Sequence, residues 1–409
     1  MRIAVFAHEF PALSETFVLN QVTGLIDLGH EVTVFADGPR AEPLVHPDVG
    51  RYGLAAQARY PGIPKGKLRR ALHAVPRVCR LARRHPRRLA RSLDFVRHGR
   101  EAASGRLLYW SARLAAERPF DAILAHFGPM GEGVCRLRRA GLIAGPVATV
   151  IHGVDISVHD AGPCRAYRHL LAEGDLLLPI SEVWHAKLLR MGADPGRTIV
   201  HHMGVDPRLY AYRERLRPAG RPVQLLTVGR LVEKKGVAVA LQAVADLVAK
   251  GMDVRYQIVG DGPLMTELCG LRDRLGLGEV VRFLGWQDQV AVSALMERSD
   301  ILLTPSLTAQ DGDQEGIPVT LMEAMASGML VVASRHSGIP ELIADGSSGI
   351  LVPEGCAGAL ATAVAGLLHP SGPDWHGFSR AARATVARDF DISILNRALA
   401  GRLSALAGR

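Results

Sequence analysis

Short apolar runs that end in glycine or polar residues alternate with helical periods along this chain, and the alternation occurs twice. Such runs are typical of strands buried on both faces of a parallel sheet. In the first half they are residues 2–7, 31–36, 122–128, 147–153, 175–181 and 198–204. In the second half they are residues 223–229, 255–262, 280–286, 300–306 and 330–338. The pattern predicts the α/β class, with two doubly wound Rossmann-like domains in tandem.

A polar, arginine-rich stretch with prolines at its ends separates the two halves, and we expect residues 207–222 to be a linker. The predicted domains are then residues 1–206 and 223–390. Helical sequence over residues 391–409 is expected to pack across both domains. Because open α/β sheets bind ligands at the carboxyl ends of their strands, we expect the domains to face a cleft that carries the chemistry.

Composition excludes several classes of protein. The chain has 409 residues, of which 48% are hydrophobic and 22% charged, as in globular proteins of two or three domains. Its five cysteines form no Cys-x-x-Cys pair, which argues against a disulfide framework or a thiolate zinc site. No signal-peptide pattern opens the sequence, and no apolar run reaches the length of a membrane span. We therefore expect a cytoplasmic protein.

The positive charge is concentrated in one segment. The whole chain has a net charge of +9, and residues 65–106 alone hold 14 Lys or Arg against two acidic residues. Pro76 and Pro86 are expected to divide this segment into short basic amphipathic helices. Their apolar positions are Leu68, Leu72, Val75, Leu89, Leu93 and Val96.

Three interpretations of these basic helices are open. They can be solvated charged faces of ordinary surface helices. They can also bind an anionic membrane surface, because cations gain energy beside lipid headgroups while an apolar stripe enters the interface. Nucleic acid is the least favoured partner, since aromatic residues make up only 5% of the chain and do not interleave with the cations.

Two glycine-containing turns follow predicted strands of the second domain. In GRLVEKKG, Gly229 permits a tight turn, and Arg230 with Lys235 could neutralise a diphosphate without a metal. In GDGP, Gly260 and Gly262 could let the backbone approach a nucleotide. Surface cations and a plain strand-to-helix turn remain the alternatives for these two motifs.

The segment EGIPVTLMEAMASG is the most informative. Pro318 at a first helical position would leave the amides of residues 317–320 free to face a phosphate. Glu315 would lie beside the group that the phosphate carries, and Glu323 would reach a ribose diol. A loop glutamate and an amphipathic-helix glutamate are the alternative interpretation.

Other acidic and histidine residues are given structural roles. We expect Asp311-Gly-Asp313 to bind no metal, because two cations and a helix terminus already offset the diphosphate charge. The pair His201 and His202 is assigned to packing. His8 and His126 end predicted strands and could line the cleft, although a structural role is favoured for both.

These motifs together resemble the retaining glycosyltransferases of family four, which have the GT-B fold. Glu315 and Glu323, with seven residues between them, carry the resemblance together with GRLVEKKG, GDGP and SGIPELIADGSSGILVPE, and it covers nearly the whole chain. The opening FPALSETFVLNQ and the HG-x-D motif from His152 to Asp155 are similar to the bacterial exopolysaccharide and colanic-acid-type branch.

The resemblance implies a role for each matching residue. Arg230 and Lys235 would hold the donor diphosphate, Glu315 the transferred sugar, and Glu323 the ribose, while His152 would approach the donor sugar. The implied donor-binding residues are Gly229, Gly260, Gly262, Gly316, Ile317, Pro318, Val319 and Glu323. Many relatives have a glycine-rich loop after the first strand, whereas this chain has PALSET. The residues assigned to the acceptor or diphosphate there are Ser14, which is also a candidate helix N-cap, Glu15, Thr16, Asp155 and His126.

The resemblance implies front-face transfer with retention, in which the leaving diphosphate takes the acceptor proton. The donor would be a UDP- or GDP-sugar, with no other cofactor and no metal. We expect a saccharide acceptor, lipid-linked at the cytoplasmic membrane face, in exopolysaccharide or cell-envelope glycan synthesis. The alternatives are a soluble secondary-metabolite acceptor, a nucleotide-sugar epimerase, and a basic membrane- or nucleic-acid-binding module without catalysis.

Overall fold

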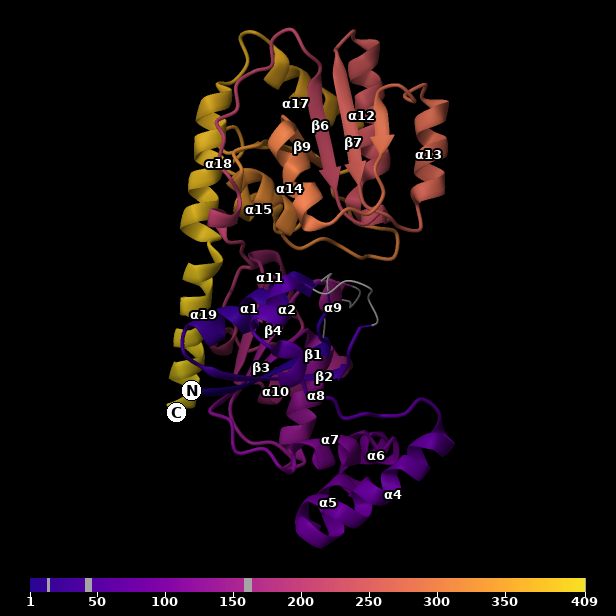
Figure 1. Cartoon of the computed structure of the whole chain (residues 1–409), viewed down its shortest axis with the longest axis vertical. Helices are drawn as coiled ribbons and strands as arrows, with labels where there is room; N and C mark the ends of the chain where they lie inside the picture. Colours follow the sequence, from indigo (N-terminus) through magenta and orange to yellow (C-terminus); the bar gives the residue numbers. More distant parts are fainter. Residues whose placement is uncertain (13–14, 41–45, 158–163, 409) are drawn as a thin grey trace. The chain divides into compact units, whose positions relative to one another are not determined.

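A computed structural model describes residues 1–12, 15–40, 46–157 and 164–408 of the chain. It divides into two compact units (Figure 1). The first comprises residues 1–179, 184–201 and 396–409, and the second comprises residues 180–183 and 202–395. The chain therefore visits the second unit briefly at residues 180–183, enters it again near residue 202 and returns to the first near residue 396.

The first unit is built on a five-stranded parallel sheet in the order β2-β1-β3-β4-β5. Its strands are β1 (Arg2–Glu9), β2 (Glu31–Gly38), β3 (Ala122–His126), β4 (Val147–Ile151) and β5 (Leu176–Pro179). All five were expected from the apolar runs. The predicted strand at 198–204 is wrong: Thr198 forms only a single bridge with Leu177. The amides of Ile199 and His201 donate to the carbonyls of Leu177 and Pro179 in β5. These few hydrogen bonds do not make the stretch a strand.

Helices cover the sheet and extend from it. They are α1 (Thr16–Asp27), α2 (Pro47–Arg51), α3 (Leu54–Gln57), α4 (Lys67–Arg84), α5 (Pro86–Ser92), α6 (Phe95–Ala103), α7 (Arg106–Leu114), α8 (Gly128–Arg139), α9 (Val154–Ser157), α10 (Arg168–Glu173) and α11 (Glu182–Arg190). Figure 1 shows α4, α5 and α6 as a group on α7 that projects away from the sheet. Among the described residues, no helix combines the length and apolar character that crossing a bilayer requires.

Two expectations about the basic segment are corrected. Pro76 does not end a helix, because α4 continues through it. Proline has no amide hydrogen for the Leu72 carbonyl, but α4 is exposed along most of its length, so water can reach that carbonyl. The side chain of Arg77 donates to the next carbonyl, that of His73, at 2.8 Å. Pro86 begins α5, as expected for a first helical position. The second predicted apolar stripe is also divided, since Leu89 lies on α5 whereas Val96 lies on α6.

The second unit contains a six-stranded parallel sheet in the order β11-β10-β9-β6-β7-β8. This is the strand order of dinucleotide-binding sheets, and the order reverses between β6 and β9. The strands are β6 (Val223–Val228), β7 (Val254–Val259), β8 (Val281–Phe283), β9 (Ile301–Thr304), β10 (Leu330–Ser334) and β11 (Ile350–Val352). The sequence pattern missed β11, which has only three residues.

Two apolar layers flank this second sheet. One joins the sheet to α12, α13 and α17, and the other joins it to α14, α15 and α18. The helices are α12 (Val237–Ala249), α13 (Met265–Arg274), α14 (Gln289–Arg298), α15 (Val319–Ala326), α16 (Ile339–Leu342), α17 (Ala357–Leu368) and α18 (Trp375–Asp389). The last helix, α19 (Ile392–Ala407), begins in this unit and continues in the first.

Residues 207–222, expected to be a linker, pack on the second unit. Tyr210 is buried, and the buried guanidinium of Arg215 donates to the carbonyls of Met296 and Glu297 at 2.9 Å each. Arg221 pairs with Asp300 at 2.7 Å. This stretch therefore has the fixed contacts of a folded element.

Candidate functional site

The loops that follow β6 and β9 in the second unit are in close backbone contact at the carboxyl ends of these strands. Gly236 ends the turn after β6 with φ 64°, and a Cβ there would lie 1.8 Å from the carbonyl oxygen of Pro305. The amide of Leu307 donates to the carbonyl of Lys234 at 2.9 Å. Only glycine allows this approach, which brings the lysines of the first loop to the acidic side chains of the second.

Glu315 lies at the centre of this contact. Its Oε2 is 2.9 Å from the ammonium of Lys235, and its Oε1 is 3.5 Å from that of Lys234. Burial alone would raise the pKa of Glu315, but the two ammonium groups outweigh it and hold this pKa below its usual value. Glu315 is therefore a buried, ionised carboxylate. Lys235 and Glu315 were expected to contact different parts of the donor, and the ion pair between them was not predicted. The sequence reasoning overlooked Lys234.

A histidine fixes the backbone of Glu315. Nε2 of the buried His336 accepts the Glu315 amide hydrogen at 3.1 Å, so the ring carries its own hydrogen on Nδ1. That Nδ1 donates to Glu354 at 2.8 Å. Sequence reasoning missed both residues. The available signal was their position: His336 follows β10, which neighbours β9, and Glu354 follows β11, the next strand along, and parallel strands end at a common edge.

Arg230 lies at the end of β6 and is exposed. Within the described part of the chain no acidic group pairs with it, so its guanidinium remains available to an anion. The nearby glycines serve backbone packing: a Cβ on Gly260 would lie 1.9 Å from the Gly229 oxygen, and one on Gly262 would lie 2.5 Å from the Leu231 oxygen. Their close approach to another loop explains these two glycines without a nucleotide.

The helix after Glu315 differs by one residue from expectation. Pro318 is the N-cap of α15, and the helix begins at Val319. Gly316 and Ile317 precede the cap, and no side chain caps the first turn. Because the first amides of a helix lack partners within it, this end can accept an anion.

Glu323 is partly buried on α15. Its Oε1 accepts a hydrogen bond from the hydroxyl of Tyr210 at 2.7 Å. Burial raises the pKa of Glu323, and this hydrogen bond only partly offsets the effect. Tyr210 belongs to the stretch expected to be a linker, so no sequence pattern indicated the contact.

The Asp311-Gly-Asp313 motif is held by protein groups. The carboxylate of Asp313 pairs with Lys234 at 2.9 Å, and Asp311 accepts the Asp313 amide hydrogen at 2.9 Å. Within residues 1–12, 15–40, 46–157 and 164–408, no three His, Cys, Asp or Glu side chains are grouped to hold a metal ion.

A second group of polar residues lies in the first unit, where β3 and β4 end. His126 Nδ1 and His152 Nε2 are 3.2 Å apart, and both rings are buried. Burial lowers the pKa of His126 to about 3 and holds that of His152 well below its usual value. Asp155 accepts the Gly128 amide hydrogen at 2.6 Å, and burial raises its pKa to about 6. Three of the predicted residues, His126, His152 and Asp155, are therefore close together, and the two histidines share a neutral hydrogen bond.

Phe127 joins these residues in a strained conformation. Its φ is 71° and its ψ is 144°, which a residue with a Cβ rarely adopts. Its ring centroid lies 4.4 Å from that of His152 and 6.1 Å from that of Phe17. No sequence pattern indicated this strain, which is typical of functional sites.

The strain leads to a stability prediction. Phe127→Ala and Phe127→Gly both remove the ring, but only glycine adopts this φ without cost. We expect the glycine variant to be more stable than the alanine variant by on the order of 1 kcal/mol in urea unfolding. Equal stabilities would contradict the assigned backbone conformation.

The remaining predicted residues have these places. Glu15 is the N-cap of α1 without a side-chain capping bond, and Thr16 begins the helix. Ser14 lies outside the described residues, so its predicted N-cap role stays a prediction. His8 is exposed and pairs with Asp37 at 3.2 Å. His201 contacts Arg402 at 2.9 Å, and His202 contacts Glu341 at 2.8 Å, as packing roles require.

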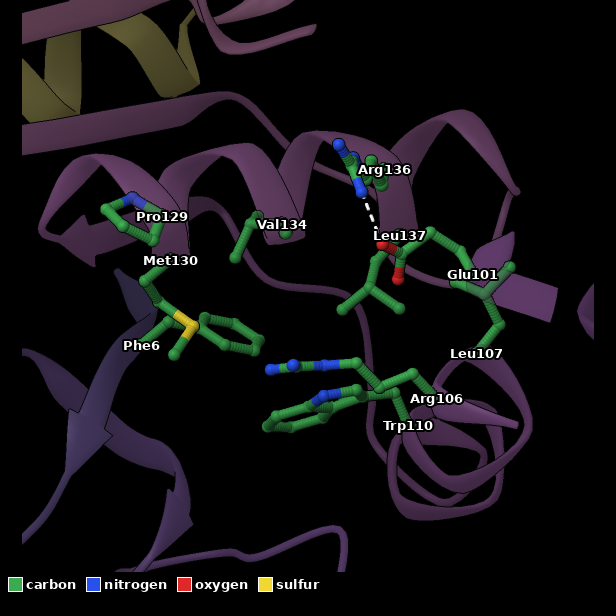
Figure 2. A pocket seen from close by; sticks show the side chains of 11 residues that line it. Phe6, Glu101, Arg106, Leu107, Trp110, Pro129, Met130, Val134, Arg136 and Leu137 are labelled. Atoms are coloured by element: carbon green, nitrogen blue, oxygen red, sulfur yellow. Dashed lines mark hydrogen bonds and ion pairs between the residues drawn. The ribbon is translucent and has the colours of Figure 1, made fainter. Parts of the chain in front are cut away.

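The pocket in Figure 2 is separate from both groups. It lies between α7 and α8, is lined by Phe6, Leu107, Trp110 and Met130, and has a volume of about 40 Å³. That volume suits one or two water molecules and is too small for a sugar ring.

Known protein families match both halves of the chain. Residues 211–385 match the family described as Glycosyl transferases group 1, and residues 14–204 match the Glycosyl transferase 4-like domain. The amylovoran biosynthesis glycosyltransferase AmsK of Erwinia amylovora is 40% identical, with 100% of each chain covered. This chain belongs to the group 1 glycosyltransferases. The family expected from the sequence motifs is thereby confirmed.

Further similarities agree with this glycosyltransferase assignment. A Salmonella typhimurium protein provisionally named colanic acid biosynthesis glycosyltransferase WcaL is 39% identical over 99% of this chain and 100% of its own. Anabaena HepE, solved with UDP-glucose, matches at a TM-score of 0.71 with 18% identity, covering 99% of this chain and 100% of its own. The predicted colanic-acid-type branch and GT-B fold are both confirmed.

Proposed function

We propose that this glycosyltransferase moves a sugar, with retention, from a UDP- or GDP-sugar to a saccharide acceptor in exopolysaccharide or cell-envelope glycan synthesis. The observation that carries the proposal is the buried, ionised Glu315, held between Lys234 and Lys235. Arg230 lies in the same loop as the lysines, and no acidic group of the described residues pairs with it. This arrangement offers two cations to a leaving diphosphate and a carboxylate to sugar hydroxyls. The names of AmsK and WcaL support the pathway, and the UDP-glucose of HepE supports the donor class.

In the proposed mechanism, Arg230 and Lys235 bind the donor diphosphate, and the free amides at the start of α15 face its phosphate. These groups stabilise the charge that grows on the phosphate as the glycosidic bond breaks. The leaving phosphate oxygen takes the acceptor proton while the acceptor oxygen attacks the same face. No metal is needed, because the cations and the helix terminus offset the charge.

The remaining donor contacts are assigned to acidic and histidine side chains. Glu315 hydrogen-bonds the transferred sugar, and Glu323 offers its second carboxylate oxygen to the ribose. His152 contacts the donor sugar, whereas His126, Asp155, Glu15 and Thr16 contact the acceptor or diphosphate. The neutral imidazole of His152 suits a hydrogen bond to a hydroxyl and adds no charge.

We infer that the acceptor is lipid-linked and that α4 to α6 contact the inner membrane surface. Apolar side chains on these basic helices are strongly exposed, namely Leu68 (76%), Leu72 (64%), Val75 (58%), Phe95 (56%) and Val96 (97%). Each cation gains about 1 kcal/mol beside anionic lipid, and the apolar side chains can enter the interface.

This inference predicts binding to vesicles that contain phosphatidylglycerol. We expect Leu68→Glu with Leu72→Glu to weaken binding at least about tenfold in co-sedimentation, since two apolar side chains leave the interface. Leu216→Glu, at a position with 73% exposure in the second unit, is the matched control. Equal binding to neutral vesicles would contradict the role of the basic side chains, and no binding to either kind of vesicle would favour a soluble acceptor.

The proposed function is tested by a nucleotide-release screen over UDP- and GDP-sugars, with and without membrane extract and with EDTA. We expect release that depends on extract and persists in EDTA, with the anomeric configuration kept in the product. A changed sugar without acceptor would indicate an epimerase. Salt-sensitive binding to nucleic acid without any turnover would indicate a binding module.

A further inference from the structure

Lys234 makes a set of contacts different from that of its neighbour Lys235. Its ammonium lies 2.9 Å from Asp313 Oδ2, 3.4 Å from the Gln314 carbonyl and 3.5 Å from Glu315 Oε1. An ammonium group has three hydrogens, so these three residues use all of them. Lys235 pairs with Glu315 alone within the described part of the chain, which leaves hydrogens for a ligand.

The difference matters when a diphosphate binds. The four side chains Lys234, Lys235, Asp313 and Glu315 are balanced, with two charges of each sign. A diphosphate adds negative charge and shares Lys235 with Glu315. When a buried carboxylate must share its cation with another anion, it becomes protonated or moves, because an uncompensated charge is costly inside a protein.

We propose that Lys234, held by Asp313, is a positioning residue that keeps Glu315 ionised and in place while the donor diphosphate engages Lys235. The proposal rests on the proposed function. Lys234 cannot be replaced in this role by the other groups facing Glu315. His336 accepts the Glu315 amide hydrogen and donates to Glu354, so it supplies no contact to the carboxylate.

The test compares Lys234→Met, Lys234→Arg and Asp313→Asn by the ratio of kcat at pH 5 to kcat at pH 7.5. In Lys234→Met the pKa of Glu315 rises, so the ratio should fall by about tenfold, while KM for the donor changes less than threefold. Lys234→Arg should restore the ratio. Asp313→Asn keeps an oxygen that can hold Lys234 and removes the negative charge that competes with Glu315 for this lysine, so its ratio should equal or exceed that of the parent protein. All three variants leave His336 and Glu354 unchanged.

Lys250→Met, at an exposed lysine beyond α12, is the matched control and should behave as the parent protein. A ratio unchanged by Lys234→Met, or lowered equally by Lys234→Arg, would overturn the proposal. If Lys234→Met does not fold, the proposal is tested by Asp313→Asn, and a lowered kcat ratio in that variant is then sufficient to overturn it. An inactive parent protein would overturn both this proposal and the proposed function, whereas an active parent with unresponsive variants overturns this proposal only.

Discussion

Replacing Arg230 and Lys235 together with alanine is expected to lower kcat/KM for nucleotide-sugar turnover by at least about a thousandfold. Each cation stabilises charge that appears on the leaving diphosphate, and removing one such group typically costs a factor of about one hundred to one thousand. Arg230 is exposed and unpaired by acids in the described residues, so its loss should leave the fold intact. Initial rates over a range of donor concentrations measure the effect.

A matched control and a binding measurement complete this experiment. Arg274→Ala with Lys250→Ala removes two exposed cations at helix ends of the same unit and should keep full activity. Trp286 is 58% exposed and follows β8 at the carboxyl edge of the sheet, where the Gly285 carbonyl accepts the Gly260 amide hydrogen, so its fluorescence is the proposed probe of donor binding. Full activity in the first double variant would refute the assignment of the diphosphate site.

Glu315→Gln is expected to lower kcat by about one hundredfold to one thousandfold. Glutamine keeps the size of the side chain but removes the charge that faces the developing positive charge on the sugar. Donor affinity should be kept or improved, because Lys235 loses its competing partner. Glu267→Gln, at an exposed position of α13, is the control.

Mass spectrometry of the parent protein with donor alone distinguishes the front-face mechanism from a covalent one. Front-face transfer predicts no sugar bound to Glu315. A glycosyl adduct on this residue would show that the carboxylate is a nucleophile. The same measurement on Glu315→Gln checks that any adduct depends on the carboxylate.

The fold was largely predictable because parallel strands buried on both faces leave apolar runs that are local in sequence. Where pairing is limited to a few backbone contacts, the pattern misled, as at Thr198, or was too short to notice, as at β11. The effect of Pro76 was predicted wrongly because, on a helix as exposed as α4, water can reach the carbonyl that the proline leaves without a donor.

Residues of the candidate site could be predicted only where one short motif contains the charged side chains that would bind the ligand. Lys235 and Glu315 were both singled out from their motifs, but the ion pair between them was not predicted. The contacts of Lys234, His336 and Glu354 depend on which loops are adjacent at the sheet edge, and no local pattern gives that information. The strain at Phe127 arises from the tertiary fold, since its residue type gives no sign of a left-handed φ.

The return of the chain at residue 396 has a consequence for biosynthesis. Leu399 and Leu403 are fully buried, and Asn396 donates to the carbonyl of Asn20 at 3.1 Å, so the last segment completes the core that the first residues begin. Residues 396–408 must therefore emerge from the ribosome before the amino-terminal body can close. Truncation at residue 395 removes a segment that belongs to the first unit. If the two units are expressed separately, residues 396–408 must be supplied to the first unit.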